Sequence, residues 1–239
     1  MASKIEKAGA LLHEQLTAIH NSGRMPVKVN GIIQFKRWQR SKQESGVYFG
    51  CPQEKPKMGR YNDPTAKTGI CYVADYAVTA IAESYGREYH QKPRGKFSIG
   101  FDEVAKAQIC TLETTRETTT IDMGRLLSLL HRTADEVMGD SQEITHIVTD
   151  WAVNTPGLHY DGITYLSRHL PGVGTCTAFW QREGMGSPLK DVDMKQLGDY
   201  VDADKENFPQ GWTGADIDGF EILTDTLDFT VVNNNEEDV

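Results

Sequence analysis

Apolar positions recur along the chain at two spacings, and each spacing predicts a different kind of element. Where they return every three to four residues with charges opposite, as in residues 3–21, an amphipathic helix is expected. Short apolar runs bounded by Gly, Pro or Asp predict strands. Helices are expected over residues 3–21, from Asp75 to Gly86, over 122–138 and 142–153, and briefly near 193–201. Strands are expected around residues 32–35, 47–49, 70–74, 107–113, 116–121, 163–167, 175–180, 219–223 and 228–232.

This mixture of helices and strands predicts an α/β (α+β) chain in which mixed β-sheets are flanked by helices. A polar turn near Pro26 separates the first helix from the remainder. We therefore expect an N-terminal helical extension over residues 1–28, a domain over 29–232, and a disordered acidic tail over 233–239.

Charge and composition narrow the classes of function. The formal net charge of −9 would repel phosphates, so binding of nucleic acid or of an anionic membrane is not expected. The chain has no apolar run of the length that a membrane span needs and no secretory leader, so a cytoplasmic protein is expected. Its four cysteines form no C-x-x-C pair and no Cys/His cluster has zinc spacing, so no metal is expected.

Common catalytic motifs are missing from the sequence. No glycine pattern has the context of a phosphate-binding loop or of a dinucleotide fingerprint, and no G-x-S-x-G surrounds a serine. What remains is a short arrangement of polar residues. It consists of Arg60 in a loop, Tyr72 on a buried strand, Glu83 on the following helix and Ser167 on a later strand.

Two points about these side chains stay open. In a regular strand Ser167 and Arg168 face opposite sides, so both can reach one pocket only if the strand bends or ends there. Arg37 and Arg40 either lie exposed on a strand with their stems along the surface, or one of them helps to hold a phosphate group. The spacing does not choose between these alternatives.

Several segments together resemble the RES-domain family, which is named for an arginine, a glutamate and a serine. The resemblance covers roughly residues 30–182. Its specific part is GICYVADYAVTAIAE (69–83) joined later by DGITYLSRH (161–169), with further support from YFG (48–50), GRYN (59–62) and AFW (178–180).

The resemblance implies an ADP-ribosyltransferase-like fold and an enzyme that consumes NAD. Such proteins are commonly the toxin of a toxin–antitoxin pair whose helix-turn-helix antitoxin blocks the active site. By position, Arg60, Glu83 and Ser167 match the naming residues and Tyr72 matches the strand tyrosine. Arg37 lies where an early arginine is often found, and Arg168 follows the serine.

Cleavage of the nicotinamide–ribose bond, by hydrolysis or by phosphorolysis with phosphate, assigns a role to each of these residues. Arg60, with Arg37, would hold the pyrophosphate, since a guanidinium binds phosphate bidentately. Glu83 would stabilise positive charge developing on the ribose, and Tyr72 would pack against ribose or nicotinamide. Ser167 has no base beside it, so hydrogen bonding to the substrate suits it better than nucleophilic attack.

Two alternatives remain beside NAD degradation. One is transfer of ADP-ribose to a protein target, which would use the same site with another acceptor. The other is a RES-like binding module without turnover. The sequence leaves the oligomeric state open, a homo-oligomer included.

Overall fold

The computed structural model describes residues 4–93, 95–182 and 184–233. Its centre is an eight-stranded sheet with the order β1-β6-β7-β8-β3-β2-β5-β9, in which β6 and β7 are parallel and the other neighbours antiparallel. These strands are β1 (Val27–Asn30), β2 (Gln34–Gln39), β3 (Ile70–Ala74), β5 (Gln108–Thr114), β6 (Thr118–Asp122), β7 (Gly162–Leu166), β8 (Thr175–Trp180) and β9 (Leu189–Gln196). The mixed sheet flanked by helices agrees with the predicted fold class.

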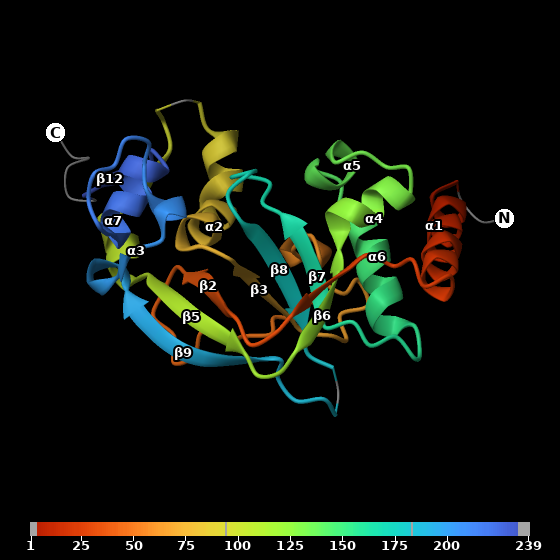
Figure 1. The fold of residues 1–239 in the computed structure, drawn as a ribbon. Helices are drawn as coiled ribbons and strands as arrows, with labels where there is room; N and C mark the ends of the chain where they lie inside the picture. The colour runs from red at the N-terminus through yellow and green to blue at the C-terminus, as the bar shows by residue number, and fades with distance from the viewer. Residues whose placement is uncertain (1–3, 94, 183, 234–239) are drawn as a thin grey trace.

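Helices cover one face of the sheet in two separate groups (Figure 1). The first group is α1 (Lys4–Asn21), α4 (Met123–Leu129), α5 (Asp135–Met138) and α6 (Glu143–Asn154); the second is α2 (Ala77–Gln91) with α3 (Phe101–Lys106). Short elements complete the chain. They are η1 (Lys55–Lys57), β4 (Ser98–Gly100), η2 (Leu197–Asp199), β10 (Val201–Asp202), η3 (Lys205–Asn207), β11 (Ile217–Asp218), α7 (Gly219–Glu221), the π-helical turn η4 (Ile222–Thr226) and β12 (Thr230–Val232).

Three apolar clusters hold these layers together. Trp151 of α6 and Leu16 of α1 pack in the first cluster against β6, β7 and β8. Trp38 of β2 and Ile81 of α2 belong to the second. The third lies on the opposite face of the sheet and is centred on Phe35 of β2. Because strand side chains alternate between faces, Trp38 and Phe35 point to opposite sides, and the first two clusters share one face.

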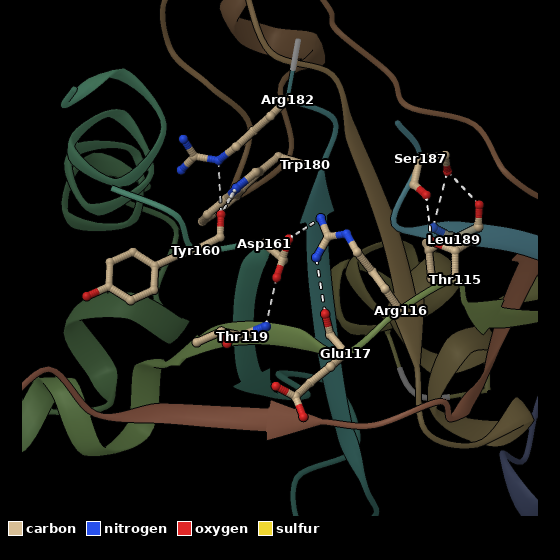
Figure 2. A network of polar contacts seen from close by, with 10 residues as sticks. All are labelled: Thr115, Arg116, Glu117, Thr119, Tyr160, Asp161, Trp180, Arg182, Ser187 and Leu189. Carbon is tan, nitrogen blue, oxygen red and sulfur yellow. Dashed lines mark hydrogen bonds and ion pairs between the residues drawn. The ribbon is translucent and has the colours of Figure 1, made fainter. Parts of the chain in front are cut away.

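The junction that starts β7 is fixed by charged groups (Figure 2). The Arg116 guanidinium donates to Asp161 Oδ1 at 2.6 Å, and the backbone N–H of Thr119 donates to Asp161 Oδ2 at 2.8 Å. Nearby, Arg182 Nε donates to the Tyr160 carbonyl at 3.1 Å. Asp161 is buried and tethers β6 to β7, so it is more than the turn residue that the Asp-Gly pair suggests.

Most predicted helices and strands are present, with some differences in their bounds. The predicted helix over 122–138 splits into α4 and α5 because His131 adopts a left-handed conformation, with φ of 53°. The helix expected to end at Gly86 continues to Gln91, and Asp75 does not cap it; Asp75 accepts hydrogen bonds from Thr175 instead.

Three predicted segments differ from the structure. Residues 189–196 form a strand, β9, where loops were expected, and the short helix expected near 193–201 is only the three-residue η2. Residues 219–223 are helical, and 47–49 form no strand. The predicted tail lies, apart from residue 233, outside the described residues. The division at residue 28 stays a prediction. No helix among the described residues is long and apolar enough to cross a membrane.

Candidate active site

A cavity of about 700 Å³ lies where the two helical groups leave the sheet uncovered. Its lining comes from β2, β3, the loop before β3, α2, the α4–α6 region and the residues after β7. Arg60, Tyr72, Glu83 and Arg168 all line it. Segments far apart in the sequence therefore meet at this cavity.

Glu83 is held in place by the turn that follows β7. Its Oε1 accepts hydrogen bonds from Ser167 Oγ at 2.7 Å, from the Arg168 backbone N–H at 2.8 Å and from the His169 N–H at 3.5 Å. Glu83 Oε2 has no hydrogen-bond partner among the described residues. The carboxylate is thus fixed through one oxygen, while the other is available to a ligand.

The end of β7 at Leu166 answers the question about Ser167 and Arg168. Because the strand stops there, alternation between faces no longer applies, and both residues reach Glu83. Ser167 is completely buried, does not line the cavity, and also accepts a hydrogen bond from the Leu170 N–H at 2.9 Å. Its hydroxyl orients Glu83, whereas contact with the substrate was expected.

Arg60 lines the cavity and contacts the end of α5. Its guanidinium donates to the carbonyl of Val137 and, at 3.0 Å, to that of Gly139. Burial lowers the pKa of the Arg60 guanidinium. Arginine carries five N–H donors, so donors beyond these two are free for another acceptor.

Tyr72 secures the loop that carries Arg60. The Tyr72 hydroxyl accepts from the Tyr61 N–H at 3.0 Å and donates to Asn62 Oδ1 at 3.0 Å. A Cβ on Gly59 would lie 2.7 Å from this hydroxyl, so only glycine fits there. Burial raises the pKa of Tyr72, which stays a neutral phenol.

Arg37 contributes to the cavity lining, but its guanidinium is engaged away from the other site residues. Its guanidinium donates to the carbonyls of Gly46 and Tyr48 and to Cys71 Sγ at 2.9 Å, on the face of the sheet turned away from α2. The role of Arg37 in holding pyrophosphate stays a prediction, and these three hydrogen bonds do not favour it. Arg37 shares its face with buried Phe35, and that alternation could have been used to place it.

Four residues of the site were missed from the sequence. Tyr61 and Tyr165 pack with their ring centroids 4.4 Å apart, and both line the cavity. His169 lines it too, and burial lowers the pKa of its imidazole. Arg87 lies one helical turn after Glu83, and that i, i+4 spacing was a usable signal. Tyr165 lies two residues after the buried Ile163 of β7, so the alternation of the strand could have placed it on the same face.

Groups of three or more His, Cys, Asp or Glu that could hold a metal ion are absent from the described residues. The polar groups around the cavity are instead guanidinium, phenol, carboxylate and imidazole. This set can bind an anion and stabilise a developing positive charge in neighbouring places.

Comparison with known proteins identifies a structure with a similar fold and a matching family. No curated protein matches the chain in sequence. A chain in the crystal structure of the Mycobacterium tuberculosis ("M.tuberculosis") MbcT–MbcA toxin–antitoxin complex matches in structure with a TM-score of 0.53 at 15% identity, over 78% of this chain and 91% of that one. At that identity the likeness concerns the fold. The RES-domain model matches residues 34–200, which is most of the chain, and the chain therefore belongs to the RES-domain family.

Proposed function

We propose that this chain degrades NAD by cleaving the bond between nicotinamide and ribose, with water or phosphate as the acceptor. Membership of the RES-domain family supports an enzyme of this kind. The cavity of about 700 Å³ is in the size range of small-molecule sites, and its lining mixes aromatic with charged side chains.

The observation that carries the proposal is the one-sided fixing of Glu83. Cleavage of a glycosidic bond passes through an oxocarbenium-like state, in which positive charge develops on the sugar. A carboxylate already oriented toward that place stabilises the charge without reorganising during the reaction. Three donors on Oε1 supply the orientation and leave Oε2 to face the ribose or an attacking water.

The remaining residues divide the other tasks. Arg60 and Arg168 bring positive charge to the cavity of an acidic protein and would bind the pyrophosphate. Tyr61 and Tyr165 provide an aromatic surface for nicotinamide or ribose. Ser167 and Tyr72 are positioning residues, because their hydroxyls are used within the protein.

We further propose that the chain is the toxin of a toxin–antitoxin pair and acts in the cytoplasm. The structural relative was solved as a toxin–antitoxin complex. A helix-turn-helix antitoxin would cover the cavity and would also make any contact with DNA, since the net charge of −9 opposes such contact by this chain.

The test is to incubate the purified protein with NAD, with and without inorganic phosphate, and to identify the products by mass spectrometry. We expect free nicotinamide together with ADP-ribose, or with its phosphorylated form when phosphate is the acceptor. ADP-ribose attached to a protein would establish the transferase alternative. A complete lack of nicotinamide release would overturn the proposal and favour a binding module.

A further inference from the structure

Asp140 lines the main cavity together with three arginines, Arg60, Arg87 and Arg168. Arg168 Nη2 donates to Asp140 Oδ1 at 2.9 Å, although the Asp140 side chain is 97% exposed. The hydrogen bond from Arg168 lowers the pKa of Asp140, and the charges of Arg87 and Arg60 lower it further. The positive charges of all three arginines therefore stabilise the ionised form of the exposed Asp140 carboxylate.

Arg87 has no assigned role in this arrangement. It extends from α2 one turn beyond Glu83, is exposed, and forms no ion pair with any described residue. It lines the main cavity and also a smaller adjoining one of about 290 Å³. Arg168 and Asp140 line both cavities as well, so the Arg168–Asp140 pair lies at their junction.

An exposed arginine is commonly no more than a solvated surface group. Here, Arg60, Arg87 and Arg168 line one cavity in a chain of net charge −9, and the Asp140 carboxylate pairs with Arg168. Guanidinium groups recognise carboxylate and phosphate oxygens with the same fork geometry. Asp140 is thus a chemical stand-in for a phosphate group.

We propose that Arg60, Arg87 and Arg168 form a phosphate-binding subsite, and that Asp140 occupies it as an internal competitor until a ligand phosphate displaces it. The inference rests on the proposed function, since the phosphate belongs either to the dinucleotide or to free phosphate acting as acceptor. Arg87 is then a binding residue, and Asp140 sets how readily the subsite accepts its ligand.

The Asp140 side chain is free to leave because it is almost wholly exposed. Its backbone neighbours are held more firmly, since Arg60 donates to the Val137 and Gly139 carbonyls. Displacement therefore requires the carboxylate to rotate away, while the connection between α5 and α6 stays in place.

The test measures the affinity of ADP and of inorganic phosphate by titration calorimetry for the wild type, Arg87→Gln and Asp140→Asn. Arg24→Gln and Asp135→Asn are the matched controls, because both residues are exposed, line neither cavity and carry the same charges. Arg87→Gln should weaken binding about tenfold, as expected for a charge-assisted hydrogen bond. Asp140→Asn should tighten it about two- to fivefold, the size of an exposed ion pair.

Opposite shifts for ADP would assign the subsite to the pyrophosphate, and opposite shifts for phosphate alone would assign it to the acceptor. The proposal is overturned if both variants match their controls, if Asp140→Asn weakens binding, or if neither ligand binds the wild type. These measurements report binding alone and do not depend on cleavage of NAD. Failure of the proposed function would appear separately, as absent nicotinamide release.

Discussion

Two acidic side chains, Glu83 and Asp161, are hydrogen-bonded at the two ends of β7 in different ways. Asp161 uses both oxygens, one for Arg116 and one for the Thr119 N–H (Figure 2). Glu83 receives all its donors on Oε1, and the donors are a hydroxyl and two backbone N–H groups with no guanidinium among them.

This difference in hydrogen bonding distinguishes Asp161, which joins β6 to β7, from Glu83, which keeps one oxygen available for a ligand. Giving each carboxylate oxygen a donor makes a buried acid a tether, because each lost bond leaves an unsatisfied group. Fixing a single oxygen orients the group while its second oxygen and its charge remain available. The role of each carboxylate therefore depends on how the donors are distributed over its two oxygens, and less on which end of β7 it contacts.

The largest effect is expected from Glu83→Gln. The amide oxygen can keep the three hydrogen bonds, but the charge that we propose stabilises the transition state is lost. Nicotinamide release should fall about 100-fold or more, with NAD affinity retained. Turnover at the wild-type rate would remove Glu83 from the mechanism. Glu88→Gln, on the same helix but outside the cavity lining, should leave the rate unchanged.

Asp161→Asn should lower the stability of the protein and leave its turnover nearly unchanged, which is the reverse of the effect expected for Glu83→Gln. It breaks the ion pair with Arg116 at a buried position, so the free energy of unfolding should fall by about 1–3 kcal/mol. Turnover of the folded protein should change little. Denaturant unfolding measures the first quantity and kcat the second, with exposed Asp199→Asn as the control. A variant as stable as the wild type would mean that Asp161 is not a tether.

A smaller effect should follow Gly86→Ala, which acts on the support of Glu83. A Cβ there would lie 2.1 Å from His169 Cγ, so the turn after β7 must move. Overpacking costs about 1–3 kcal/mol and the gain in helix propensity returns about 1 kcal/mol, so a net loss of about 1 kcal/mol is expected with reduced turnover. Gly9→Ala in α1 meets only an ordinary contact at 3.6 Å and should stabilise the protein. Equal gains in both variants would contradict the role of this packing.

Strands with a buried apolar face were predictable from the sequence, and β3 is the clearest case. Ile70 to Ala74 form a continuous apolar run bounded by glycine and aspartate. β9 was missed because LKDVDMKQ is charged on both faces, as suits the edge of a sheet. Its pairing with β5 is a long-range contact that no local pattern records.

Part of the cavity lining was predictable from the sequence, and the geometry of its side chains was less so. Glu83, Arg60 and Arg168 do line one cavity. The use of the Ser167 hydroxyl by Glu83 depends on where β7 ends, and the Arg60 contacts depend on the bend at His131 that separates α4 from α5. Such details arise from tertiary packing, which periodicity does not describe.

The parallel pairing of β6 with β7 has an evolutionary consequence. Two neighbouring strands that run the same way oblige the chain to return over the sheet, and here the return path of α4, α5 and α6 is also one wall of the cavity. Residues can be gained or lost at the exposed bend before α5 without shifting any strand register. The mouth of the site can therefore diversify while the sheet that carries it is inherited intact.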